Sequence, residues 1–137
     1  MPLFPVRRDA DSSAFFDGTA ENQFLLVHDT QTGAYRDPTA DISVDPARYE
    51  LIPAAGTGTV VSWSVVHARG ADGPTRTVVG IVQFDEGPWW WGEFAGVDPD
   101  TDLTDAHVEV IFVSSGDTDR DEKVPQFRVA DSARQPA

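Results

Sequence analysis

The amino-acid sequence predicts a mainly β protein in which a short helix precedes a small antiparallel barrel or sandwich. Three observations predict this class. Short apolar runs of strand length recur after residue 57, with Gly, Pro and Asp between them. No segment after residue 22 has the apolar spacing of a long helix. A chain of 137 residues, 40% of them hydrophobic, is long enough to bury one core without disulfide bridges.

Residues 11–22 predict the short helix. Phe15 and Phe16 give it an apolar face, and Gly18 is expected to end it. Three polar residues near its start can cap it: Asp11, Ser12 and Ser13.

The segments on either side of this helix are less regular. Two prolines and two arginines indicate an arm over residues 1–10, and the apolar run 24–28 predicts a strand. Residues 29–48 contain Gly33, Pro38 and Pro46 and have too few apolar side chains for a core, so we expect a loop-rich appendage.

A strong β pattern begins at residue 49. A first candidate strand covers 49–53, and five further strands are expected to form the barrel, joined by loops that include 68–76 and 96–104. The predicted organisation is therefore an N-terminal part over 1–48, a barrel over 49–130 and a frayed tail over 131–137. The five barrel strands are predicted at residues 59–67, 77–84, 89–95, 106–113 and 124–129.

Alternation along a strand assigns side chains to opposite faces. In strand 59–67 it places Val61, Trp63, Val65 and His67 on one face and Val60, Ser62, Ser64 and Val66 on the other.

The consecutive tryptophans Trp89, Trp90 and Trp91 divide in the same way, with Trp90 opposite the other two. One face must pack on the core, and the other is either covered by the helix through Phe15 and Phe16 or left open for a partner.

Charge and composition exclude several functions. The net charge of -13 makes a general affinity for phosphate backbones improbable. The absence of cysteine excludes disulfides, thiolate zinc sites and thiol nucleophiles, and it fits a reducing compartment, so we expect a cytoplasmic protein. No apolar run is long enough for a membrane helix, and residues 1–10 lack the pattern of a signal peptide.

We expect no catalytic residues, no metal and no cofactor of the chain's own. The three histidines, His28, His67 and His107, are far apart in the sequence and do not have the spacing of a metal site. Ser62 and Ser64 lie inside a predicted strand rather than on the turn that presents a nucleophile.

Several strings in fixed order resemble the acyl-CoA-associated OB-fold proteins, long known as domain-of-unknown-function family thirty-five. Residues 56–85 contain G-T-G-T-V-V-S-W-S-V-V-H followed by V-V-G-I-V-Q-F-D-E-G. A G-V-D-P loop follows at 96–99, then a V-E-V-I-F strand at 108–112 and a closing P-Q-F-R string at 125–128. The resemblance implies that the barrel is an OB-fold.

The front end is similar to the same family, whose members carry a helix with an aromatic pair, an apolar strand and a zinc ribbon with two Cys-x-x-Cys knuckles. The knuckle positions correspond here to Asp29 and Thr32 and to the neighbourhood of Asp41 and Val44. All four cysteines are therefore missing. The resemblance implies a degenerate, metal-free rubredoxin-like ribbon that either persists without metal or has become a docking loop.

The resemblance also implies a function. Family members accompany thiolase-like enzymes as subunits that complete the acyl-CoA site, so we expect a non-catalytic accessory subunit of a thiolase, a thiolase-like aldolase or an acyltransferase. We expect a hetero-oligomer in which acyl-CoA is a shared ligand held by Arg69 and Arg76. The expected partner contacts are Phe15, Phe16, Trp90, Gly96, Asp98 and Pro99.

A binder of single-stranded nucleic acid is the alternative of a different class. Trp63 or the cluster at 89–91 would then stack on bases. The negative charge of the chain opposes this alternative.

Overall fold

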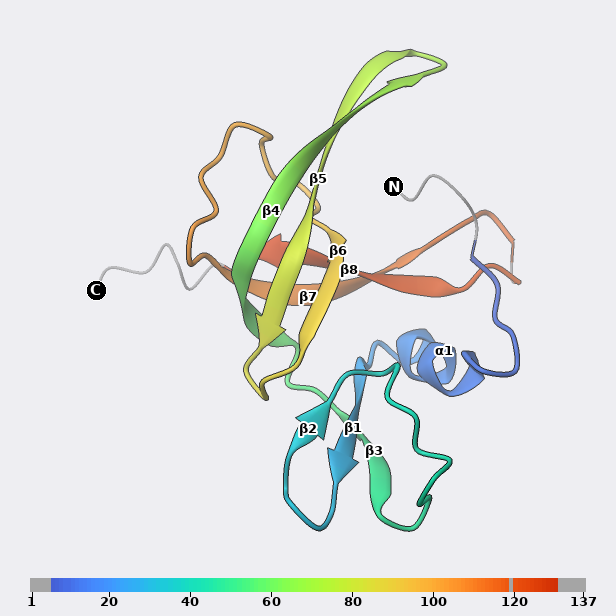
Figure 1. The fold of residues 1–137 in the computed structure, drawn as a ribbon. Helices are drawn as coiled ribbons and strands as arrows, with labels where there is room; N and C mark the ends of the chain where they lie inside the picture. Colours follow the sequence, from blue (N-terminus) through green and yellow to red (C-terminus); the bar gives the residue numbers. More distant parts are fainter. Residues whose placement is uncertain (1–5, 119, 131–137) are drawn as a thin grey trace.

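The computed structural model describes residues 6–118 and 120–130, and these residues form one short helix and two antiparallel sheets (Figure 1). The predicted tail 131–137 and the first five residues of the predicted arm lie outside the described residues. The helix and the first sheet comprise α1 (Ser13–Ala20), β1 (Leu25–Asp29), β2 (Tyr35–Arg36) and β3 (Tyr49–Pro53). The second sheet comprises β4 (Thr57–Gly70), β5 (Gly73–Phe84), β6 (Trp89–Glu93), β7 (His107–Ser114) and β8 (Lys123–Val129).

The five-stranded sheet curls into a small barrel. Its strand order is β6-β5-β4-β7-β8, and its outer strands meet through a parallel bridge between Phe94 and Phe127. The backbone N–H of Ala95 donates to the carbonyl of Phe127 at 2.7 Å in the same place. This is the partly open, five-stranded barrel of an OB-fold, so the predicted fold class is confirmed.

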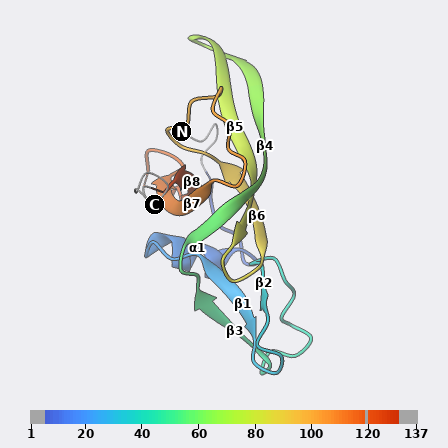
Figure 2. The ribbon, with the colours of Figure 1, turned by 90° about the vertical axis from the view of Figure 1, so that its left-hand side faces the viewer.

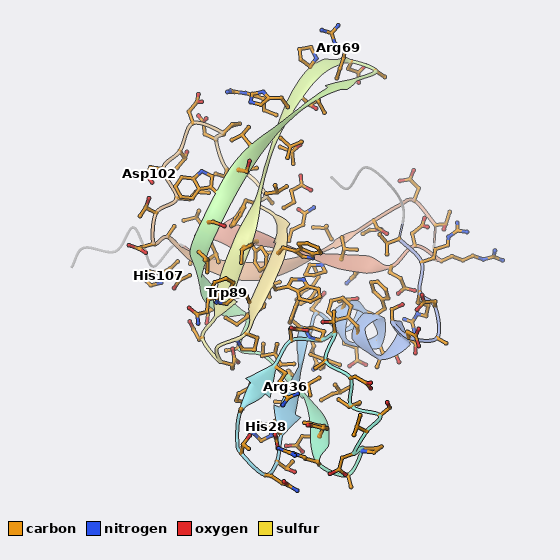
Figure 3. All side chains as sticks on the ribbon, in the orientation of Figure 1. His28, Arg36, Arg69, Trp89, Asp102 and His107 are labelled. Atoms are coloured by element: carbon orange, nitrogen blue, oxygen red, sulfur yellow. The ribbon has the colours of Figure 1, made fainter. Side chains whose placement is uncertain are left out.

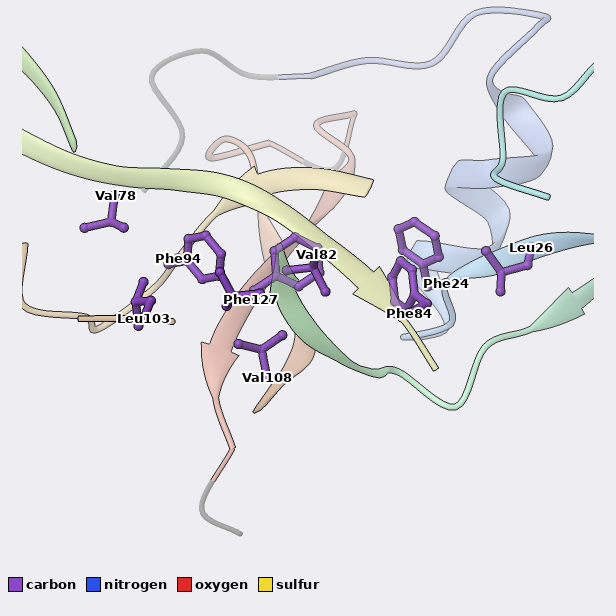
Figure 4. Close-up of a cluster of buried hydrophobic side chains, with 10 residues drawn as sticks. Phe24, Leu26, Val78, Val82, Phe84, Phe94, Leu103, Val108 and Phe127 are labelled. Carbon is purple, nitrogen blue, oxygen red and sulfur yellow. The ribbon is translucent and has the colours of Figure 1, made fainter. Parts of the chain in front are cut away.

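The core fills the barrel and continues to the first sheet. Figure 4 shows Phe84 beside Phe24, whose ring centroids lie 4.6 Å apart, and Phe127 beside Phe94 at 5.8 Å. Leu26 of β1 is fully buried in the same cluster, so the two sheets share one core. The other buried members are Val60, Val78, Val82, Leu103 and Val108.

Helix α1 is shorter than predicted and does not end at Gly18. Ser12 occupies the cap position without a side-chain cap bond, and the helix ends beyond Ala20, where Asn22 has a φ of 60°. Gly18 is buried against β1, and a Cβ there would lie 2.8 Å from Cγ of Leu25. A close approach of helix and strand therefore explains this glycine, and Asn22 supplies the left-handed turn.

A β-bulge corrects the predicted faces of β4. The register with β5 shifts between Val60 and Ser62, so Val61 is the extra residue and is 41% exposed. Val60 consequently lies in the core, on the same side as Trp63, although simple alternation places these two residues on opposite faces.

The segment 68–76, predicted as a loop, is mostly strand. β4 and β5 stay paired up to Gly70 and Gly73, and only a two-residue turn joins them. Gly73 has a φ of 114°, which favours glycine in this turn. β6 pairs with β5 only from Val79 to Gln83, so the N–H that Pro74 lacks removes no hydrogen bond to β6. The result is a long hairpin that projects from the barrel (Figure 1).

The first sheet has the order β2-β1-β3 and occupies the region predicted as a loop-rich appendage; we call residues 25–53 the ribbon. β3 pairs with β1, so this strand belongs to the ribbon although the predicted boundary at residue 48 assigned it to the barrel. Figure 2 shows the ribbon at the end of the barrel opposite the tip of the hairpin.

An ion pair fastens the ribbon. The buried carboxylate of Asp29 accepts from Nε of Arg48 at 2.9 Å and from Nη2 at 2.7 Å. It also accepts from the backbone N–H groups of Gln31 at 2.9 Å and Thr32 at 3.3 Å. These bonds hold the pKa of Asp29 well below its usual range, chiefly through Arg48. Whether the ribbon is a degenerate zinc ribbon stays a prediction.

Candidate partner-binding surface

The three consecutive tryptophans lie on β6, and the register with β5 assigns them to opposite faces. Trp90 pairs with Val82, a core residue, whereas Trp91 pairs with Ile81 and Trp89 with Gln83. The ring of Trp90 lies 5.9 Å from Phe15 and 5.5 Å from Phe24, centroid to centroid. Trp90 is thus half-buried beneath α1, on the face that packs on the core. Of the two alternatives for the other face, the structure shows the open one.

The opposite face of the same strands is open. Trp91 is 73% exposed and Trp89 is 55% exposed, and beside them on β5 lie the partly exposed side chains of Ile81 and Val79. We call these four residues the tryptophan face. In Figure 3, Trp89 lies on the barrel strands beside the ribbon, far from the tip of the hairpin.

Two shallow depressions flank the tryptophan face. One has a volume of about 260 Å³ and is lined by Asp37, Thr39, Ile81 and all three tryptophans. The other has a volume of about 480 Å³ and shares Ile81 and Trp91 with the first. Asp37 comes from the ribbon, so the ribbon contributes one wall.

The charge around the tryptophan face is negative. Asp37 and Glu93 line the two depressions, and no Lys, Arg or His lines either of them. Asp85 and Glu86 form the turn that leads into Trp89, but their carboxylates accept from the Thr57 hydroxyl and from the backbone N–H of Ala55, and neither residue lines a depression. The surface is therefore apolar at its centre and acidic at its margin.

The other predicted contacts lie apart from this face. Phe15 and Phe16 pack inward, with ring centroids 5.4 Å apart, and Phe16 is only 9% exposed. Gly96 and Asp98 are exposed in the loop after β6, and Pro99 is partly exposed there. The carboxylate of Asp98 accepts the backbone N–H of Asp100 at 2.9 Å, which shapes this turn.

The two arginines predicted for acyl-CoA lie at the distal end of the hairpin. The register pairs His67 with Arg76 and Arg69 with Pro74, so the three basic side chains share one face of the hairpin. Nη1 of Arg76 also lies 3.3 Å from a carboxylate oxygen of Asp100. An open depression of about 500 Å³ lies among these residues.

The acidic and histidine side chains of residues 6–118 and 120–130 form no metal cluster, and the clear pKa shifts among the carboxyl groups are all downward. No three His, Asp or Glu side chains in this range gather closely enough to hold a metal ion. Hydrogen bonds from Ser, Thr or Arg lower the pKa of each of these carboxyl groups. Arg8, for example, lowers the pKa of Glu122. None of them is poised as a general acid near neutral pH. The described part of the chain also contains no helix able to cross a membrane.

Sequence reasoning divided the tryptophans correctly but selected Trp90 as the contact. The missing information was which face meets the helix. Gly92, which follows the three tryptophans, gives a hint, because a Cβ there would lie 3.0 Å from the ring of Phe127. A glycine at that register marks the side of the strand that must approach the core, which is the side of Trp90.

The comparisons with known proteins agree with this architecture. Residues 51–113 match the family model described as the C-terminal OB-fold domain of ChsH2. A solved structure described as the Ltp2-ChsH2(DUF35) aldolase is similar over 89% of this chain and 96% of that chain, with a TM-score of 0.72 and 21% sequence identity. No curated protein sequence matches the chain significantly.

Proposed function

Because residues 51–113 match the family model of the ChsH2 C-terminal OB-fold domain, we propose that this chain is an accessory subunit of a thiolase-like acyl-CoA enzyme. In this proposal it works in the cytoplasm and performs no chemistry of its own. The partner is a thiolase, a thiolase-like aldolase or an acyltransferase, and the two form a hetero-oligomer.

The observation that carries the proposal is the extent of the structural likeness. The similarity to a chain of the Ltp2-ChsH2(DUF35) aldolase covers 96% of that chain, so it includes the N-terminal part as well as the barrel. A bare OB-fold barrel would be a weak argument, since many unrelated functions use it. The shared combination of helix, ribbon and barrel is a more specific basis for a shared role.

The surface of the chain gives independent support. The described residues present no metal cluster, and each carboxyl group with a clear pKa shift is shifted downward, but they do present an exposed aromatic face. An exposed apolar surface is what an interaction subunit requires, because such a subunit acts through its contacts with another protein.

The proposal includes a contribution to acyl-CoA binding by the hairpin. Coenzyme A is a polyanion, and Arg69, Arg76 and His67 share one face of the hairpin in an otherwise acidic chain. We expect Arg69→Ala and Arg76→Ala to raise the KM of the complex for acyl-CoA and to leave kcat nearly unchanged. Arg120→Ala, at an exposed arginine of the β7–β8 loop, is the matched control.

Co-expression with a thiolase-like protein from the same organism tests the proposal. We expect both chains to elute as one species in size exclusion with light scattering, and we expect the enzyme to be more active with this chain than without it. Separate monomers with unchanged enzyme activity would contradict the proposal, as would turnover of an acyl-CoA by the isolated chain.

One observation favours the alternative of single-stranded nucleic-acid binding. Exposed Trp89 and Trp91 lie on β6, paired with β5, and these third and second barrel strands form the usual oligonucleotide face of an OB-fold. No Lys, Arg or His of the described residues lines the two depressions, which opposes this alternative because such grooves are positively charged. Filter binding with a single-stranded oligonucleotide at low salt distinguishes the two, since tight binding would favour the alternative.

A further inference from the structure

We infer that the tryptophan face, Val79, Ile81, Trp89 and Trp91, is the surface through which this chain binds its partner protein. The matching surface of the partner is apolar at its centre and carries Lys or Arg at its margin. The inference deepens the proposed function and rests on it, because the partner is the thiolase-like subunit.

The first argument is the amount and continuity of exposed aromatic surface. Trp91 is 73% exposed and Trp89 is 55% exposed, which together leave roughly 250 Å² of indole in water if each side chain offers about 200 Å². Isolated exposed apolar residues are ordinary, but these two lie beside Ile81 and Val79 on adjacent strands. A contiguous apolar patch of this kind marks a binding surface.

The second argument is that the strands hold the face in place. β5 lies between β4 and β6, and it pairs with β6 at five successive positions, from Val79 with Glu93 to Gln83 with Trp89. The backbone under both indoles is therefore fixed before any partner arrives. Aromatic side chains on a rigid sheet lose little conformational entropy on binding, which is the property of interface hot spots.

The third argument is charge, which selects the kind of partner. Asp37 and Glu93 line the depressions beside the face, and no Lys, Arg or His of the described residues lines them. A nucleic acid would bring phosphates against these carboxylates, and a second copy of this chain would bring the same acids and another net charge of -13. A protein surface with basic residues around an apolar centre is the complementary partner.

The test measures binding of purified variants to an immobilised thiolase-like protein from the same organism. We expect Trp91→Ala to raise the Kd about 30-fold and the double variant W89A/W91A to raise it further. Val44→Ser is the matched control, since Val44 is 86% exposed but lines neither depression, and we expect its Kd to stay within twofold. The association rate should fall as salt rises.

Thermal melting of each variant shows that it is folded before its binding is compared. If the wild-type chain forms no complex, the proposed function fails and this inference fails with it. If the wild-type chain binds and W89A/W91A binds equally well, the inference alone is wrong. A dimer of the isolated chain, or binding of a single-stranded oligonucleotide, that is lost in Trp91→Ala would assign the face to a different occupant and would also overturn it.

Discussion

The two faces of β5 and β6 differ in how far their aromatic residues are buried. On the inner face, Trp90 packs on Phe15 and Phe24, and Val82 opposite it is fully buried. On the outer face, Trp89 and Trp91 are flanked by β5 side chains and remain more than half exposed. One short strand therefore supplies both an anchor for the N-terminal helix and a surplus of apolar surface. Trp90 therefore contributes to the stability of the fold, whereas Trp89 and Trp91 remain available for the partner that we propose.

The largest expected effect separates Trp90 from Trp91. Trp90→Ala removes the side chain between α1 and the core, and we expect it to cost about 3 kcal/mol of the free energy of unfolding, or roughly 10 °C in Tm. Trp91→Ala removes an indole with little burial, so its cost should be within about 0.5 kcal/mol. Urea unfolding and thermal melting measure both. Equal losses in the two variants would contradict the division of the faces.

The next effect concerns Gly80, which lets the sheet close on its inner side. A Cβ at this position would lie 2.3 Å from the carbonyl oxygen of Ser62 and 2.7 Å from Cε2 of Phe94. We expect Gly80→Ala to lower the free energy of unfolding by about 1–3 kcal/mol through overpacking. Gly70→Ala is the control, because its nearest neighbour atom lies at 3.6 Å. A fully stable Gly80→Ala variant would show that the inner face has more room than described.

The third prediction concerns the ion pair between Asp29 and Arg48, which fastens the ribbon beside the tryptophan face. Asp29→Asn removes the charge that meets Arg48, and we expect Tm at pH 7 to fall on the order of 5 °C. Since the pKa of Asp29 is lower in the folded than in the unfolded chain, its contribution is present at neutral pH. It is lost as pH falls from about 4, the unfolded value, toward the depressed folded value.

Thermal melting of both proteins between pH 7 and pH 2 provides the check. The gap in Tm between wild type and Asp29→Asn should shrink as the pH falls. A gap that stays constant down to pH 2 would mean that the Asp29 carboxylate contributes nothing through its charge.

The smallest expected effect is spectroscopic. Acrylamide quenches exposed indoles more readily than packed ones, so Trp91→Ala should remove more of the quenchable fluorescence than Trp63→Phe, since Trp63 is partly buried against the core. Stern–Volmer slopes measured on folded samples give this comparison. A larger loss in Trp63→Phe would reverse the exposures assigned to the two tryptophans.

The sequence was sufficient for the parts of the fold that depend on local pattern. The barrel strands, the division of Trp89, Trp90 and Trp91 between two faces, and the absence of a long helix all follow from alternation and spacing. The OB-fold itself came from the resemblance of ordered strings, and the family match at residues 51–113 agrees with it.

The parts that depend on distant contacts could not be predicted. The bulge at Val61 shifts one strand by a residue, which no local pattern reveals. Pro74 and two glycines suggested a loop where the chain forms an edge hairpin, because edge strands tolerate residues that central strands do not. The pairing of Asp29 with Arg48 joins residues 19 positions apart, and the choice between Trp90 and its neighbours depended on where α1 packs.

The most direct test of the central claim is hydroxyl-radical footprinting of Trp89 and Trp91 in the free chain and in its complex with the thiolase-like protein. Mass spectrometry of the fragmented peptide resolves oxidation at each of the three consecutive tryptophans. We predict fast oxidation of Trp91 and Trp89 in the free chain and strong protection of both in the complex, with Trp90 slow in each state. Unchanged oxidation of Trp89 and Trp91 in a verified complex would contradict the account.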